Sequence, residues 1–303
     1  FDARAGHAGL ADQGRLGLVY GLSAYLLWGL LPFFFIALLP AGPLEILGNR
    51  IVWTFLLCLV LLAARREAGW VRPLLRRGRL LVGLTVAAAL IAVNWLTYLK
   101  AVIDGHTSEG ALGYFLNPLV TVALGVLVLR ERLRPLQWLA VAIAAVAAGF
   151  LTVVAGQIPV TALTLAVTFA LYGLLKNRMG ADLPALHGLT VETAVLLPLA
   201  AGILVTLSAA SETTFAANGV GHSLLLVLTG PVTAVPLLLF AAAARRIPLV
   251  TVGLLQFIAP VMQLLASLAL GEYISAARWV GFAIVWLALV VLTIDSLHAR
   301  LRR

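Results

Sequence analysis

Cysteine, charge and metal-ligand clusters are all scarce in this chain of 303 residues. Cys58 is its single cysteine, which excludes a disulfide framework and a thiolate metal site within one chain. The five histidines are scattered, and none is paired at metal-ligand spacing. The sequence also lacks a glycine-rich phosphate loop, a nucleotide-hydrolysing motif and an Asp-rich cluster for magnesium diphosphates. We therefore expect no metal, no cofactor and no ATP-driven step within this chain.

The chain is rich in apolar residues and poor in charged ones. Hydrophobic residues make up 62% of the chain and charged residues 11%, and the mean hydropathy is +1.07. Apolar runs of about 20 residues are what helices need to cross a hydrocarbon core about 30 Å thick. The runs are continuously apolar instead of alternating at every second residue, which favours helices over a membrane barrel. The predicted fold class is an all-α membrane protein.

Ten transmembrane helices are expected. Their predicted spans are 16–38, 44–63, 81–100, 110–129, 136–154, 159–176, 189–208, 223–243, 249–270 and 277–295. The first run is too long for a signal-peptide core and lacks a convincing cleavage site, so we count it as a span.

The two halves of the chain carry the same pattern. Phe115, Pro118, Glu131 and Trp138 recur as Phe257, Pro260, Glu272 and Trp279. Five spans in each half require the second copy to start from the opposite side of the membrane. This arrangement is typical of inverted-repeat transporters, whose binding site lies near the midplane where the halves meet. The expected organisation is a tail (1–15), two five-helix repeats (16–154 and 159–295) and a basic tail (296–303).

Basic residues orient the chain. Of the 21 Lys and Arg residues, 18 fall on one predicted side, only Lys100 and Arg278 on the other, and Arg50 within the second span. Because Lys and Arg of short loops stay on the cytoplasmic side, both termini should be cytoplasmic and the protein multi-pass in the plasma (inner) membrane. The net charge of +9 suits anionic lipid headgroups, so membrane lipid is the expected partner and nucleic acid is not.

The stretch from Glu109 to Val120 and several shorter segments in both halves resemble the RarD family, a branch of the EamA transporters within the drug/metabolite transporter superfamily. The most specific is Glu109-Gly110-Ala111-Leu112-Gly113-Tyr114-Phe115-Leu116-Asn117-Pro118-Leu119-Val120. Supporting segments are Glu45 with Asn49-Arg50-Ile51-Val52-Trp53, Asn94-Trp95, Glu131, Gln137-Trp138, Tyr172-Gly173-Leu174, Glu192-Thr193, Pro236-Leu237, Gln256-Phe257, Gly271-Glu272 and Trp279. Gly110-Ala111 departs from the expected Ala-Ser and removes a hydroxyl. The resemblance implies ten helices, two EamA repeats and export of small metabolites or drugs; the family label, chloramphenicol-sensitive, describes a phenotype.

Four charged residues are candidates for gating or coupling: Glu45, Arg50, Glu109 and Glu192. Charges inside spans are costly and usually face the bundle interior or water. At 1.5 Å per residue, Arg50 lies about 9 Å from the outer end of its span and Glu192 about 5 Å from the inner end of its own. Inverted symmetry places them in opposite vestibules, with Glu192 the candidate for proton coupling. Alternatively both are structural, with Arg50 near Glu45 or Glu109 and Glu192 near Lys176.

The candidate substrate-binding residues are aromatic or amide side chains within spans. They are Trp28, Asn94, Tyr114, Asn117, Tyr172, Gln256 and Gln263. Trp28 and Tyr172 fall near the midplane, where aromatic faces suit a flat or cationic substrate, or simply pack between helices. Pro118 and Pro260 are expected to break their helices and free carbonyls toward a cavity.

A secondary transporter of a small-molecule substrate is the favoured function. Metabolites, amino acids and amphipathic drugs all remain open as substrates, and protons are the candidate coupling ion. A channel would need a continuous polar stripe, and an intramembrane enzyme a close catalytic constellation; neither is found. Small residues on the fifth span, Ala140, Ala144 and Ala148, predict either a homodimer contact or packing within the monomer.

Overall fold

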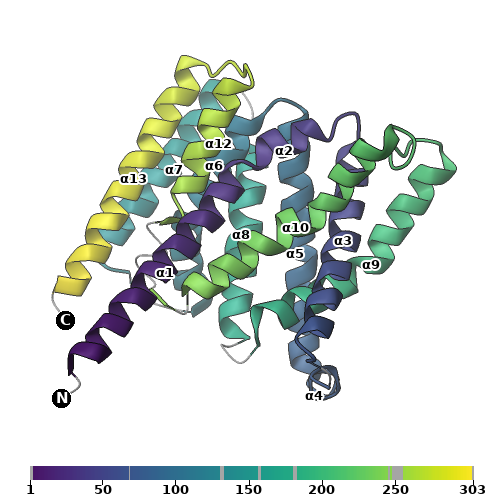
Figure 1. Ribbon diagram of the computed structural model, residues 1–303. Coiled ribbons are helices and arrows are strands. Elements are labelled where there is room, and N and C mark those ends of the chain that lie inside the picture. Colours follow the sequence, from purple (N-terminus) through teal and green to yellow (C-terminus); the bar gives the residue numbers. More distant parts are fainter. Residues whose placement is uncertain are drawn as a thin grey trace.

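The computed structural model describes residues 3–67, 69–129, 133–155, 158–179, 183–244, 246–247 and 255–301. The regular structure in these ranges is all helical (Figure 1). The helices are α1 (Ala3–Gly29), α2 (Leu31–Ala37), α3 (Pro43–Ala64), α4 (Val71–Leu75), α5 (Gly78–Ile103), α6 (Thr107–Leu129), α7 (Pro135–Ala155), α8 (Val160–Arg178), α9 (Ala185–Ala209), α10 (Gly219–Ala244), α12 (Ile258–Ala269) and α13 (Ala276–Leu301). The all-α prediction is confirmed.

Six helices of the described chain are long and apolar enough to cross a membrane: α3, α5, α7, α9, α10 and α13. A seventh span results if α1 and α2, bent by 42° at their junction, count as one. Two further apolar helices, Val160–Lys176 and Ile258–Ala269, are shorter. The chain is therefore a multi-pass membrane protein. Ten spans remain a prediction, and the start of the predicted span 249–270 lies outside the described residues, as does Glu131.

The first predicted span is not one straight helix. α1 ends at Gly29 and α2 begins at Leu31, with Pro32 in its first turn. Proline has no N–H to donate to the carbonyl of Trp28 four residues earlier, which explains the break. Helix also extends into both predicted tails, because α1 begins at Ala3 and α13 continues to Leu301.

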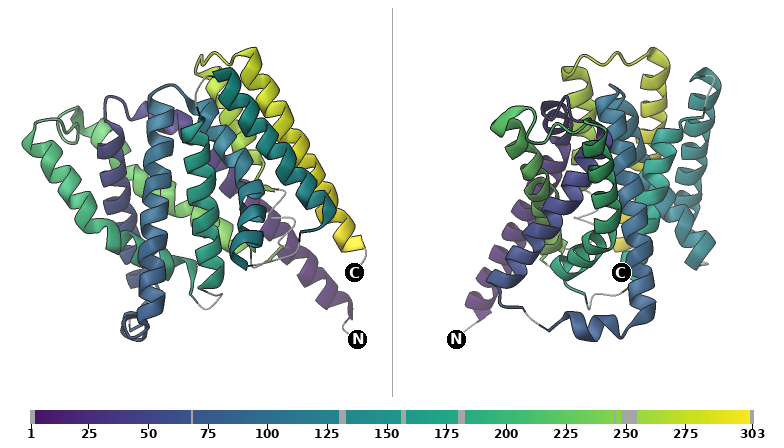
Figure 2. Two further views of the ribbon diagram at one scale, coloured as in Figure 1. Left: turned by 180° about the vertical axis from the view of Figure 1, so that it is seen from behind. Right: turned by 90° about the vertical axis from the view of Figure 1, so that its right-hand side faces the viewer.

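The helix contacts between the two halves of the chain occur in matched pairs. A contact that a first-half helix makes with the second half has a counterpart that a second-half helix makes with the first half. α1 packs against α10 and α12, as α8 packs against α5 and α6. The α3 helix meets both α9 and α10, and α9 meets both α3 and α5. Two further close pairs are α6 with α12 and α7 with α13. Both ends of the chain lie at one end of the helix array, near which α4 also lies (Figures 1 and 2).

The small residues of α7 pack within the chain. Ala140 and Ala144 are buried in a core cluster that includes Phe282 and Val285 of α13. Small side chains let helix backbones approach closely in a membrane. The structure therefore supports packing within the monomer as the role of this face.

Candidate functional site

Arg50 is a buried cation on α3, with 5% of its surface exposed. Its Nε donates a hydrogen bond of 2.7 Å to Oγ1 of Thr233 on α10. Its guanidinium carbon lies 4.2 Å from the ring centre of Trp95 and 5.7 Å from that of Phe35, within cation–π range. Across the described ranges, no carboxylate forms an ion pair with this charge.

A glycine makes the contact between Arg50 and Thr233 possible. Gly230 lies one turn before Thr233 on α10, and a Cβ built on it would lie 2.6 Å from the backbone C and O of Trp53. A side chain can move aside, but a helix backbone cannot do so locally. Only glycine therefore lets α3 and α10 cross this closely.

Glu192 is a buried anion on α9, with 2% of its surface exposed. One carboxylate oxygen accepts a 2.7 Å hydrogen bond from Nζ of Lys176, and the other accepts a 3.1 Å bond from the hydroxyl of Tyr172. Lys176 also lies over the Tyr172 ring, 5.7 Å from its centre. The prediction that Glu192 lies near Lys176 is confirmed.

A row of aromatic rings connects the surroundings of these two charges. The aromatic row consists of Phe35, Tyr98, Tyr114, Phe169 and Tyr172. Successive ring centres are 5.4 to 6.2 Å apart, the separation of contacting rings. The first ring contacts Arg50 and the last donates to Glu192, so the row links both charges through α2, α5, α6 and α8.

Trp28 belongs to a different aromatic cluster. It packs against Tyr25 and Phe240, with ring centres 5.3 and 5.9 Å away, between α1 and α10. Among the described residues no ring contact joins it to Tyr172. Both residues are half-buried against the same core cluster. They border one core without touching each other.

Gln263 bonds the backbone carbonyl that is left free at the break between α1 and α2. Its Nε2 donates a 3.2 Å hydrogen bond to the carbonyl of Trp28, the group that Pro32 cannot bond. Its Oε1 is buried and has no partner in the part of the chain that the structure describes. Gln256, predicted beside it, is half-buried just before α12.

Asn94 joins three helices. Its amide nitrogen donates to the carbonyl of Leu165 at 3.1 Å and to the hydroxyl of Thr168 at 3.0 Å, both on α8. Its amide oxygen accepts a 3.1 Å bond from the hydroxyl of Tyr114 on α6. Asn117, expected in the same polar set, instead keeps a buried amide oxygen without a partner in the described ranges.

Neither predicted helix-breaking proline ends a described helix. α6 continues through Pro118, so the expected break there is wrong, although the ladder still loses one N–H. Pro260 lies in the first turn of α12, where its missing N–H has no intrahelical acceptor in any case. The observed break is at Pro32, which sequence reasoning missed.

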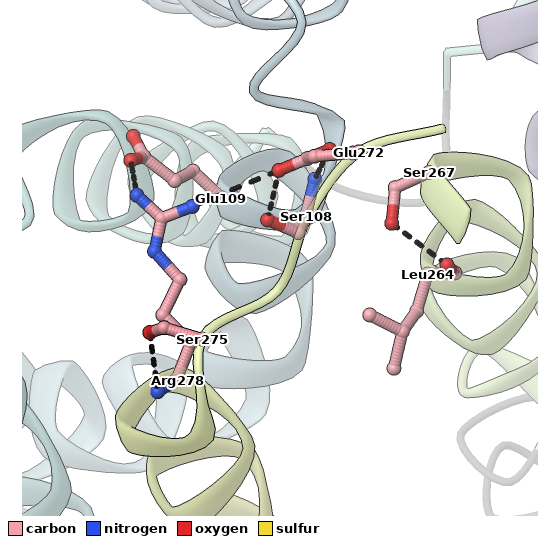
Figure 3. A network of polar contacts seen from close by, with 7 residues as sticks. All are labelled: Ser108, Glu109, Leu264, Ser267, Glu272, Ser275 and Arg278. Carbon is pink, nitrogen blue, oxygen red and sulfur yellow. Dashed lines mark hydrogen bonds and ion pairs between the residues drawn. The ribbon is translucent and has the colours of Figure 1, made fainter. Parts of the chain in front are cut away.

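A polar network ties the start of α6 to the loop between α12 and α13 (Figure 3). The backbone N–H of Ser108 donates to Glu272 at 2.9 Å, and the Ser108 hydroxyl contacts the same carboxylate. An Arg278 Nη lies 2.8 Å from Glu109, and its other Nη lies 3.7 Å from Glu272. Glu109 thus has its own cation.

Glu45 holds the segment that follows α9. One of its carboxylate oxygens accepts hydrogen bonds from the backbone N–H groups of Thr214 at 2.7 Å and Phe215 at 3.0 Å. The expectation that Arg50 lies near Glu45 or Glu109 is therefore wrong, since both carboxylates bond elsewhere. Glu45 precedes Arg50 by five residues, whereas helix neighbours are three or four apart.

Sequence reasoning missed most of the groups around Arg50. Trp95 and Tyr98 had a signal, because they lie beside and one turn after Asn94 on the same apolar span. Thr233 had none, because its role depends on which helix crosses α3. Gly230, three residues earlier, only hinted at a close crossing.

The chain is similar to known transporters along its length. The EamA-like transporter family matches residues 15–153. Protein RarD of Streptomyces exfoliatus is 48% identical over 292 residues, covering 96% of this chain and 92% of that protein. An uncharacterized transporter of Pseudomonas aeruginosa is 45% identical, with 93% and 94% covered. Protein RarD of Escherichia coli is 38% identical, with 96% and 98% covered.

A solved crystal structure of a protein shares the fold. It has a TM-score of 0.57 and 19% identity, and the match covers 92% of this chain and 97% of that one.

Proposed function

The chain belongs to the RarD family of EamA-like transporters, and on that premise we propose that it is a secondary active transporter working by alternating access. Its substrates are small metabolites, amino-acid-like compounds or drugs, and the direction is export. It crosses the plasma membrane ten times as two inverted five-helix repeats, with both termini in the cytoplasm.

The paired helix contacts support the repeat. In such a transporter, each contact made by one repeat has a counterpart made by the other, and the substrate site lies between them. The contacts of α1 with α10 and α12, matched by those of α8 with α5 and α6, follow this rule. Arg50 and Glu192 then mark the outer and inner ends of the route.

The aromatic row is the observation that carries the proposal. It runs between two buried charges through α2, α5, α6 and α8. Aromatic faces bind apolar bodies of varied shape, which suits a carrier for drug-like and metabolite-like compounds. The ties between α6 and the α12–α13 loop must break when the outer side opens.

Glu192 is the proposed proton-coupling group. It is buried among α8 and α9 and held by one flexible cation and one hydroxyl. Substrate movement that separates Lys176 from Glu192 would leave an unpaired buried carboxylate, which then takes up a proton.

Transport and its mechanism are tested together. Metabolite levels in cells with and without the protein select compounds, and the purified protein is then reconstituted into liposomes. A carrier shows counterflow, in which substrate inside the vesicle accelerates uptake of labelled substrate, and a proton gradient drives accumulation above equilibrium. A passive channel, the alternative, shows neither effect. Substrate conversion without transport would favour an intramembrane enzyme.

Topology has a separate test. Reporter fusions after residue 70 and after residue 215 are expected to report cytoplasm and exterior, respectively. The same location for both would contradict the inverted repeat.

A further inference from the structure

We propose that Arg50 binds the carboxylate of an anionic substrate, with the hydroxyl of Tyr98 as a second donor. This inference rests on the proposed transport function and names its substrate class: small organic monocarboxylates with an aromatic or apolar body. It starts from a charge without a counter-charge in the interior of a membrane protein.

An isolated cation in a buried position is energetically costly. Desolvating a guanidinium costs several kcal/mol unless an anion or a full set of acceptors compensates. Arg50 donates one described hydrogen bond, from Nε to Thr233, and one of its faces lies over Trp95. Both Nη groups lack an acceptor among the described residues. These are the donors that bind a carboxylate or phosphate side by side.

A second group near Arg50 is also unsatisfied. Tyr98 is 2% exposed, packs against Phe35, the ring that also contacts Arg50, and its hydroxyl has no hydrogen-bond partner among the described residues. A buried hydroxyl without a partner is itself unfavourable. The guanidinium of Arg50 and the ring of Tyr98, whose hydroxyl is unsatisfied, therefore lie against the same side chain, Phe35.

The hydroxyls of Thr233 and Tyr114 already donate their hydrogens to other groups. Oγ1 of Thr233 donates to the carbonyl of Thr229 at 2.7 Å while accepting from Arg50. The hydroxyl of Tyr114 donates to Asn94. The unsatisfied groups here are donors, and an acceptor-only ligand such as a carboxylate completes them.

The side chains near Arg50 indicate the chemistry of the rest of the ligand. Phe35 and Trp95 lie against the guanidinium, Tyr98 packs against Phe35, and all three offer apolar area. No carboxylate of the described chain pairs with Arg50, so none is shown there to bind a second, cationic group of a ligand. A simple monocarboxylate therefore fits better than a zwitterionic amino acid. Because Arg50 is 5% exposed, the ligand reaches it only when the surrounding helices separate.

The test uses three matched probes on the purified full-length protein: 3-phenylpropanoate, its neutral amide 3-phenylpropanamide, and phenylalanine. Ligand-dependent shifts of the melting temperature report affinity. We expect 3-phenylpropanoate to stabilise the protein and the other two to bind at least about 10-fold more weakly. Equal shifts for acid and amide, or no shift with the acid, would overturn the proposal.

Variants then locate the site. Arg50→Gln should weaken 3-phenylpropanoate binding about 10- to 100-fold, and Arg50→Lys, which keeps the charge and loses the fork, should do so to a smaller extent. Tyr98→Phe should weaken it about 3- to 10-fold without loss of fold, because the hydroxyl makes no bond in the described chain. Lys100→Gln, an exposed cation on the same helix as Tyr98, is the control and should bind normally.

The outcome is separable from that of the proposed function. Counterflow of any substrate that persists unchanged in Arg50→Gln, together with unaltered acid binding, would leave a transporter and refute the Arg50 site. Acid binding lost in Arg50→Gln, with no counterflow in the wild-type protein, would keep the site and refute transport.

Discussion

Arg50 and Glu192 are both almost fully buried, and we propose that they occupy equivalent positions of two repeats, yet their surroundings differ. Glu192 has a cation at 2.7 Å and a hydroxyl at 3.1 Å. Arg50 has one hydroxyl acceptor and two aromatic rings, and no described carboxylate. Glu192 is compensated by a cation of the same chain, whereas Arg50 has no described counter-charge.

The difference separates two roles that look alike in sequence. A compensated charge suits coupling, because its ion pair can open and close within the transport cycle. An uncompensated charge suits ligand binding, because the ligand supplies what the chain lacks. Substitutions at or near Arg50 and Glu192 test this difference.

Glu192→Gln has the largest expected effect. The amide keeps the shape of the side chain and cannot titrate, so accumulation driven by an imposed pH gradient should fall to the equilibrium level while exchange down a concentration gradient persists. Uptake into proteoliposomes with and without the gradient measures both. Asp295→Asn removes a buried carboxylate that pairs with Arg134 and is the control, with accumulation retained. Undiminished accumulation in Glu192→Gln would make Glu192 structural.

Gly230→Ala should follow in size. Its Cβ would meet the Trp53 backbone at 2.6 Å, so α3 and α10 must separate, at a cost of about 1 to 3 kcal/mol in stability. Gly83→Ala, on α5, is the control. There the added Cβ meets Sδ of Met179 at 2.9 Å, the flexible end of a side chain that moves aside cheaply. Melting temperatures in detergent compare the two, and an equal loss would contradict a backbone-limited crossing at Arg50.

Lys176→Met should lower stability, whereas Arg50→Met should not. Breaking a fully buried ion pair costs about 3 to 5 kcal/mol. Lys176 is 32% exposed, so we expect a loss of about 1 to 3 kcal/mol when Glu192 loses it. Arg50→Met removes a charge that no carboxylate compensates and should leave stability unchanged or higher. Thermal unfolding of both variants decides, and a comparable loss in Arg50→Met would show that Arg50 is a structural charge.

The helices were predictable from the sequence because long apolar runs form them. Side-chain contacts that depend on which helices pack together were not predictable. Glu192 with Lys176 was predictable from the two helices that flank one short loop. Thr233 beside Arg50 was not, because it requires knowing that α10 crosses α3 at Gly230. Pro32 carried a usable signal, a proline within an apolar run, and its consequence, the carbonyl of Trp28 bonded by Gln263, again depended on packing.

The smallest effect should distinguish two tyrosines whose rings are 5.4 Å apart. Tyr114 donates a hydrogen bond to Asn94, so Tyr114→Phe should lower stability by about 0.5 to 1.5 kcal/mol. Tyr98 donates none to a described residue, so Tyr98→Phe should leave stability unchanged or slightly raise it, because a buried unpaired hydroxyl is removed. Both variants keep the ring and its packing, so the hydroxyl alone accounts for any difference in melting temperature. Equal losses would mean that the Tyr98 hydroxyl already has a partner in the free protein, and the region around Arg50 would then be as fully compensated as the region around Glu192.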